Sequence, residues 1–140
     1  MKTHRIEIRP IYADLDAMNI VYNGTYLRFF EYGRTELMRA TGIPYTVIEE
    51  QGLHFPVTEA NVRFRQPAHY DELLYLDTWI SWMKKVSLRF QYRLCRPEGD
   101  SLVELVTGFT THGCITHQGR VSPLPAMVSE ALRPYVSFKE

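Results

Sequence analysis

Apolar residues recur at helical spacing over residues 26–40 and predict one long helix. The apolar positions that share one face of this helix are Tyr26, Phe29, Phe30, Gly33, Leu37 and Ala40. A glycine inside a helix costs about 1 kcal/mol relative to alanine, so we interpret Gly33 as a point where the helix approaches a sheet closely. Gly42 and then Pro44 follow in the order that commonly ends a helix.

The opposite face of this helix is polar. Its spacing of three residues predicts weak ion pairs between Arg28 and Glu31 and between Glu36 and Arg39. The aromatic face is too broad to be covered by a loop, and we expect it to pack on a sheet as part of the core.

Alternation of apolar and polar residues predicts a first strand over residues 4–11, with Ile6 and Ile8 on one side. Proline and glycine predict a hairpin turn at residues 97–100, and a second turn is expected at residues 117–120. Short helices are expected at residues 44–51 and 126–132. The longer segments of β-type composition are 55–65, 72–83, 87–96 and 102–116.

These elements predict an α+β fold in a single domain over residues 1–140. Five or six mostly antiparallel strands would curl around one long central helix. One helix cannot cover so large a sheet, so we expect another subunit to bury the sheet edge or the other face.

Composition narrows the functional classes. Sixteen basic and sixteen acidic side chains give zero formal net charge, which argues against a nucleic-acid-binding or peripheral membrane protein. No apolar run reaches the roughly 20 residues that span a bilayer, and residues 1–5 lack a signal-peptide core. We therefore expect a cytoplasmic protein without membrane insertion, whose two cysteines, Cys95 and Cys114, stay reduced.

The candidate chemistry lies in residues 12–24, where two carboxylates, Asp14 and Asp16, precede the long helix. The free N–H groups of a helix start can hold negative charge, and a nearby carboxylate can attack a carbonyl or activate water. Asp16 is the candidate nucleophile or general base, with a turn or capping aspartate as the alternative. Asp14 fits a turn residue or a hydrogen-bond acceptor behind the site.

The motif in this region resembles a known signature. From Asp16 the chain reads Asp-Ala-x-x-x-Val-Tyr-x-x-x-Tyr-Leu-Arg-x-Phe-Glu-x-x-Arg-Thr-Glu, which resembles the hotdog-fold acyl-CoA thioesterases. The resemblance is to the 4-hydroxybenzoyl-CoA thioesterase family, including its Tol-Pal-associated acyl-CoA thioesterases. Two later blocks of the chain resemble the same family, Phe55-Pro56-Val57 and Pro67-Ala68-x-Tyr70-Asp71.

The resemblance implies hydrolysis of an acyl-CoA or aroyl-CoA thioester to a free acid and CoA, without a cofactor. It also implies homodimers that commonly pair into homotetramers, with active sites at the dimer interface. Asp16 would be the nucleophile or general base, and the backbone N–H of Asn23, together with that of Gly24, would polarise the carbonyl. The open alternatives are hydrolysis of thioesters on acyl carrier protein and non-catalytic binding of acyl thioesters. A structural dimer module and a hotdog dehydratase fit the motif less well.

The chain departs from the family pattern in two places. Met18-Asn19 replaces a Gly-Gly pair, although asparagine can adopt a left-handed backbone conformation. Asn23 replaces a histidine or tyrosine, which removes a possible proton carrier, and its side chain could instead cap the helix.

Further candidates for substrate binding lie outside this motif. Tyr12 is close enough in sequence to line the site, although a core position describes it better. Candidates for binding the phosphates of CoA are Lys84, Lys85, Arg89 and Arg120, with Arg63 and Arg65 as weaker ones. Each could instead be an ordinary solvated residue.

Metal binding and cysteine chemistry are not expected. His112, Cys114 and His117 are near one another in sequence, but no second pair of ligands completes a zinc site.

Overall fold

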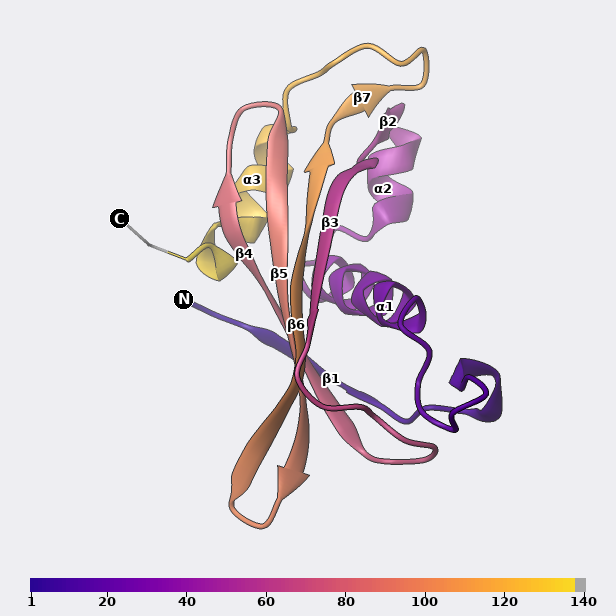
Figure 1. Cartoon of the computed structure of the whole chain (residues 1–140). Helices are drawn as coiled ribbons and strands as arrows, with labels where there is room; N and C mark the ends of the chain where they lie inside the picture. Colours follow the sequence, from indigo (N-terminus) through magenta and orange to yellow (C-terminus); the bar gives the residue numbers. More distant parts are fainter. Residues whose placement is uncertain (138–140) are drawn as a thin grey trace.

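A five-stranded antiparallel sheet forms the centre of the computed structural model, which describes residues 1–137 (Figure 1). The strand order is β1-β4-β5-β6-β3, and a separate two-stranded sheet pairs β2 with β7. This arrangement confirms the predicted α+β class with an antiparallel sheet. The strands are β1 (His4–Ile8), β2 (Leu53–His54), β3 (Val57–Phe64), β4 (Leu74–Met83), β5 (Ser87–Glu98), β6 (Ser101–Gly113) and β7 (Ile115–Thr116).

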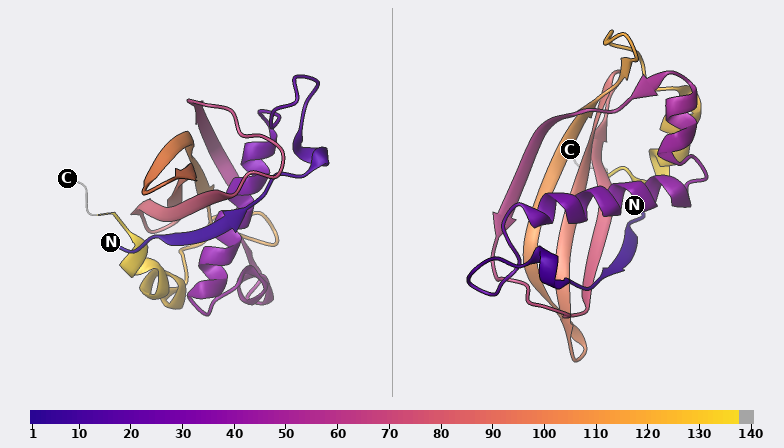
Figure 2. Two further views of the ribbon diagram at one scale, coloured as in Figure 1. Left: turned by 90° about the horizontal axis from the view of Figure 1, so that it is seen from below. Right: turned by 90° about the vertical axis from the view of Figure 1, so that its right-hand side faces the viewer.

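The predicted long helix is confirmed as α1 (Thr25–Ala40), which crosses one face of the sheet (Figure 2). The two short helices are confirmed as α2 (Tyr45–Glu50) and α3 (Ala126–Leu132). Short 3-10 turns, η1 (Tyr12–Asp14) and η2 (Arg133–Tyr135), complete the helical elements of residues 1–137. None of the helices in this part of the chain is long and apolar enough to cross a membrane.

Strand boundaries differ from the sequence prediction where prolines and turns intervene. Strand β1 ends at Ile8 rather than at residue 11, because Pro10 has no N–H to donate and the chain then enters η1. Pro97 stays inside β5, so the hairpin turn consists of Gly99 and Asp100 alone. Gly99 has φ 60°, which explains the glycine at this position.

The predicted strand over residues 102–116 is in fact two strands, β6 and β7. The second of these pairs with β2, a two-residue strand that the sequence analysis did not predict. The turn expected at residues 117–120 follows β7, with Gly119 at φ 87°. Strands of two residues are too short to show a periodic pattern in the sequence. Each is defined only by its pairing with the other strand.

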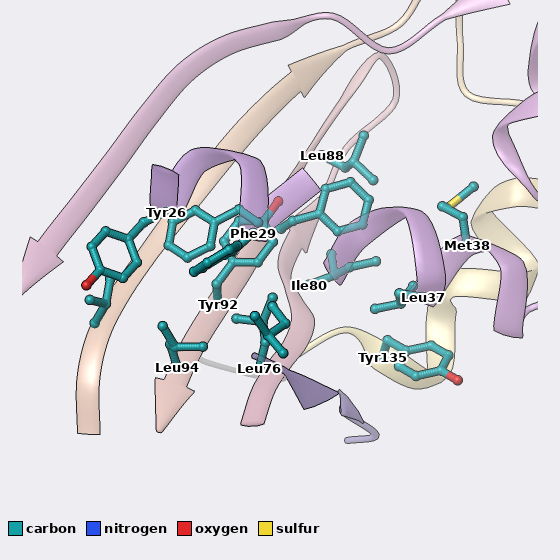
Figure 3. Close-up of a cluster of buried hydrophobic side chains, with 14 of the residues drawn as sticks. Tyr26, Phe29, Leu37, Met38, Leu76, Ile80, Leu88, Tyr92, Leu94 and Tyr135 are labelled. Atoms are coloured by element: carbon teal, nitrogen blue, oxygen red, sulfur yellow. The ribbon is translucent and has the colours of Figure 1, made fainter. Parts of the chain in front are cut away.

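The apolar face of α1 packs into the core (Figure 3). Phe30 stacks on Tyr92 of β5, with ring centroids 4.2 Å apart. The prediction was wrong at Ala40, which is exposed in the last turn, whereas Met38 is fully buried. Helix α3 and η2 close the same core, because Leu132 and Tyr135 belong to its buried cluster.

Gly33 lies where α1 approaches the sheet, as predicted. A Cβ atom added there would lie 2.5 Å from Thr78 Oγ1 and 2.8 Å from Leu76 Cδ2. We expect Gly33→Ala to lower the free energy of unfolding by about 1–3 kcal/mol, because overpacking outweighs the better helix propensity of alanine. Urea unfolding measures this, with Arg39→Ala on the exposed face as the control. A Gly33→Ala protein as stable as the native one would contradict the close approach.

The ion pairs of α1 differ in one respect from the prediction. Arg39 Nε lies 3.2 Å from Glu36 Oε1, which confirms that pair. Arg28 pairs with Asp14 and not with Glu31. Asp14 is only 2% exposed, and a buried carboxylate is strongly stabilised by a positive partner.

Candidate active site

The turn that carries Asp16 is a small hairpin between η1 and α1, projecting from the rest of the chain (Figure 2). The Asp16 N–H donates to the carbonyl of Ile20 over 2.9 Å, and the Tyr22 N–H donates to the carbonyl of Asp14 over 2.8 Å. Asn19 lies at the tip with φ 65°, which confirms the left-handed conformation expected there. The turn is therefore ordered by its own backbone, without the glycine pair of the family motif.

The Asp16 side chain is half-buried. Its Oδ1 accepts a hydrogen bond of 2.8 Å from the Met18 N–H, so Asp16 does stabilise its turn. Within residues 1–137, however, its Oδ2 accepts no hydrogen bond. One carboxylate oxygen thus holds the side chain in place while the other is free to act on water or on a carbonyl.

The two residues just before α1 present free backbone donors. The Thr25 N–H donates to the carbonyl of Tyr22 over 2.9 Å, and no side chain caps the helix, so the capping role considered for Asn23 is not observed. The N–H groups of Asn23 and Gly24 find no acceptor in the part of the chain that the structure describes. They lie at the positive end of the helix dipole, where a developing negative charge is stabilised.

A hollow of about 230 Å³ opens beside Asn23. Two hydrogen bonds hold its wall to the loop after β3. The Val21 N–H donates to the carbonyl of Ala68 over 2.9 Å, and the Ala68 N–H donates to the Tyr26 hydroxyl over 3.3 Å. Burial raises the pKa of Tyr26, which keeps this hydroxyl neutral. The hollow is lined by Ile20, Val21, Asn23, Tyr26, Phe64, Arg65, Gln66 and Pro67.

Phe64 and Gln66 were not considered as site residues from the sequence, whereas Arg65 was a weaker candidate for the CoA phosphates. Phe64, Arg65 and Gln66 reach the hollow from the end of β3, about forty residues after Asn23. No local pattern relates the two segments, because only the folded sheet brings them together.

Tyr12 lies in the same turn region, and the prediction that it is a core residue was wrong. It is 74% exposed and stacks on Tyr70, with ring centroids 4.1 Å apart. Within η1 only Asp14 is buried, and Tyr12 lies on the solvent side of the turn. It therefore lies on the surface, in the segment that precedes Asp16.

Lys84, Lys85 and Arg89 are not brought near Asp16 within one chain. They belong to the β4–β5 hairpin, at the other end of the sheet from residues 12–24 (Figure 1). Lys84 lies over the ring of Trp82, with Nζ 4.6 Å from its centroid.

Arg89 is already engaged. Its Nε donates to Thr111 Oγ1 over 2.8 Å, its Nη2 lies 3.0 Å from Glu59 Oε1, and its guanidinium stacks on Phe109. Binding a phosphate there would require Glu59 to be displaced, whereas Lys84 and Lys85 are exposed.

A buried polar chain crosses the core behind α1. Tyr92 OH lies 2.6 Å from Thr110 Oγ1, which lies 2.8 Å from His112 Nε2, and His112 Nδ1 is 2.9 Å from the carbonyl of Phe55. Burial lowers the pKa of His112 to about 4. A neutral imidazole that donates from Nδ1 and accepts at Nε2 satisfies every contact. From its sequence position, His112 was considered only as a possible metal ligand.

The other residues considered for metal or cysteine chemistry are also separated. Burial raises the pKa of the Cys114 thiol, which disfavours the thiolate. His117 is exposed and stacks on His54, with ring centroids 4.4 Å apart. Among residues 1–137, no three His, Cys, Asp or Glu side chains are grouped closely enough to hold a metal ion.

Residues 12–132 match the model of the family described as the thioesterase-like superfamily. The chain is 32% identical over 100 residues to an acyl-CoA thioester hydrolase, YbgC, of Escherichia coli O6:H1, covering 71% of this chain and 75% of that protein. It is 30% identical over 128 residues to a 1,4-dihydroxy-2-naphthoyl-CoA hydrolase of Thermosynechococcus vestitus, covering 86% and 84%. The solved structure of a DHNA-CoA thioesterase from Staphylococcus aureus superimposes with a TM-score of 0.80 at 26% identity, covering 96% and 87%.

Proposed function

Because this chain belongs to the thioesterase-like superfamily, we propose that it hydrolyses an acyl-CoA or aroyl-CoA thioester to a free acid and CoA. The observation that carries this proposal is the Oδ2 of Asp16, which accepts no hydrogen bond, together with the N–H groups of Asn23 and Gly24 just before α1, which also lack partners within residues 1–137. These are the two parts that thioester hydrolysis needs, an oxygen nucleophile or base and donors for the carbonyl oxygen.

In the proposed reaction the thioester carbonyl oxygen accepts hydrogen bonds from the N–H groups of Asn23 and Gly24. In one route Asp16 attacks the carbonyl carbon and gives a mixed anhydride, which water then hydrolyses. In the other route water attacks the carbonyl carbon while Asp16 removes a proton from that water. In both routes the C–S bond breaks, the CoA thiolate leaves and takes up a proton, and water supplies the new oxygen. One well-placed amide donor is worth about 10²–10³ in rate.

We also propose the hotdog arrangement in a single domain over residues 1–140, with two chains pairing as a homodimer and dimers associating as a homotetramer. The open edge of β3 supports such pairing, since Val57 and Phe64 on it are 47% and 52% exposed. A second chain could also bring its Lys84 and Lys85 toward the CoA phosphates of this site. The cytoplasmic location stays a prediction.

Thiol release from a panel of short-chain, long-chain and aromatic acyl-CoAs tests the activity. We expect turnover of at least one class, with the preferred acyl group set by the hollow beside Asn23. Turnover only of thioesters on acyl carrier protein would favour the carrier-protein alternative. Binding of acyl-CoA without thiol release would overturn hydrolysis and leave the non-catalytic binding module.

A further inference from the structure

Asp14 is nearly fully buried beside the Asp16 turn, and its side chain joins two segments. One carboxylate oxygen, Oδ2, accepts a hydrogen bond of 2.8 Å from the Ile11 N–H, in the segment that enters the turn. The other, Oδ1, pairs with the guanidinium of Arg28 in α1. The side chain therefore links the entry of the turn to the helix that follows it.

The backbone carbonyl of Asp14 adds a third link. It accepts hydrogen bonds from the Tyr22 N–H, over 2.8 Å, and from the Thr25 hydroxyl, over 3.3 Å. These two residues flank Asn23 and Gly24, whose N–H groups are the proposed carbonyl donors. One residue thus fixes the start of the turn, its end and the first turn of α1.

Arg28 is held in the orientation that this pair requires. Its Nη1 donates to the Tyr32 hydroxyl over 3.3 Å, one turn further along α1, and its guanidinium lies 5.6 Å from the ring centroid of Phe29. A carboxylate as buried as Asp14 is strongly destabilised without a positive partner. Loss of Arg28 would therefore release Asp14 from its position.

We propose that Asp14 and Arg28 are positioning residues, whose ion pair sets Asp16 at the correct distance from the Asn23 and Gly24 amides. This inference rests on the proposed hydrolysis. Neither residue lines the hollow beside Asn23; both line a separate cavity of about 380 Å³ between α1 and β1. They act through the turn and not through contact with the thioester. A displacement of about 1 Å in an active site can cost roughly 10² in rate.

The test compares steady-state kinetics of the native protein, Asp14→Asn and Arg28→Gln, far below their unfolding temperatures. Asparagine still offers an oxygen to the Ile11 N–H but carries no charge for Arg28. We expect kcat to fall by about 10–100-fold in each variant, with KM changed by less than about threefold, because only the alignment of reacting groups is lost. The double variant should lose little more than either single variant, since both remove the same ion pair.

Two further variants separate positioning from general stability. Arg28→Lys keeps the charge and should recover part of kcat, although lysine lacks the fork geometry of arginine. Arg39→Gln breaks the exposed Arg39–Glu36 pair on the same helix and should leave kcat unchanged.

The outcomes distinguish this inference from the proposed function. Native kcat in Asp14→Asn, a loss confined to KM, or a loss equal to the unfolded fraction seen by circular dichroism would each overturn the positioning role alone. Absence of thiol release by the native protein would overturn both. Loss of turnover in Asp16→Asn with full activity in Asp14→Asn would support the proposed hydrolysis. It would exclude only the positioning role of the Asp14–Arg28 ion pair.

Discussion

Asp16→Asn is expected to lower kcat for acyl-CoA hydrolysis by about 10²–10⁴-fold. Asparagine is nearly isosteric and its oxygen can still accept the hydrogen bond from the Met18 N–H, so the turn should keep its shape. What it lacks is the negative charge needed to attack a carbonyl or to take a proton from water. Thiol release under saturating substrate measures the change.

Asp100→Asn is the matched control for this variant. Asp100 is an exposed aspartate in the β5–β6 hairpin turn, and the same substitution there should leave turnover unchanged. Binding of an acyl-CoA to the Asp16→Asn protein should persist, which shows that the loss is chemical. An Asp16→Asn protein as active as the native one would exclude Asp16 as nucleophile and as general base.

Acidification is expected to destabilise the fold through His112 by about 3 kcal/mol between neutral pH and pH 4. Burial, with a smaller contribution from the nearby Arg34 charge, lowers the pKa of His112 in the folded chain from 6.5 to about 4. In this range the unfolded chain binds the proton more readily than the folded chain does. The stability that neutral His112 contributes to the fold is therefore fully present above pH 6.5 and is lost as the pH falls toward 4.

The geometry explains why a charged His112 is disfavoured. A proton on Nε2 would face Thr110 Oγ1, 2.8 Å away, so the Thr110 hydroxyl would have to donate to the Tyr92 hydroxyl instead of accepting from it. The Tyr92 proton would then have no acceptor among these three side chains. Carboxylates also titrate in this range, so the comparison must isolate the histidine. We expect His112→Gln to be less stable at pH 7 but to lose less stability on acidification than the native protein.

Urea unfolding at pH 7, 6, 5 and 4 measures this difference in slope. His117→Gln, which removes an exposed histidine from the turn after β7, should keep the native pH dependence. Equal slopes in the native protein and His112→Gln would show that His112 does not contribute to acid unfolding.

The sequence by itself determined the elements with strong local periodicity. Helix α1, which is 16 residues long, was predicted because apolar residues at helical spacing over so long a segment indicate only an amphipathic helix. Its close approach to the sheet was predicted from a single glycine, Gly33. The position of Asp16 in the turn that leads into a helix was also predicted, since turn residues and helix starts are encoded locally. The α+β class followed from the order of these elements.

Only the tertiary structure decided which distant groups meet. Arg28 lies fourteen residues from Asp14, and the sequence paired it with Glu31 because spacing on a helix surface cannot reveal a buried carboxylate from another segment. Likewise, the chain from Tyr92 to His112 and the wall that β3 adds to the hollow arise from strand register. Periodicity reports which face of an element is buried, whereas contacts between elements depend on how those faces are packed, and that information is spread over the whole chain.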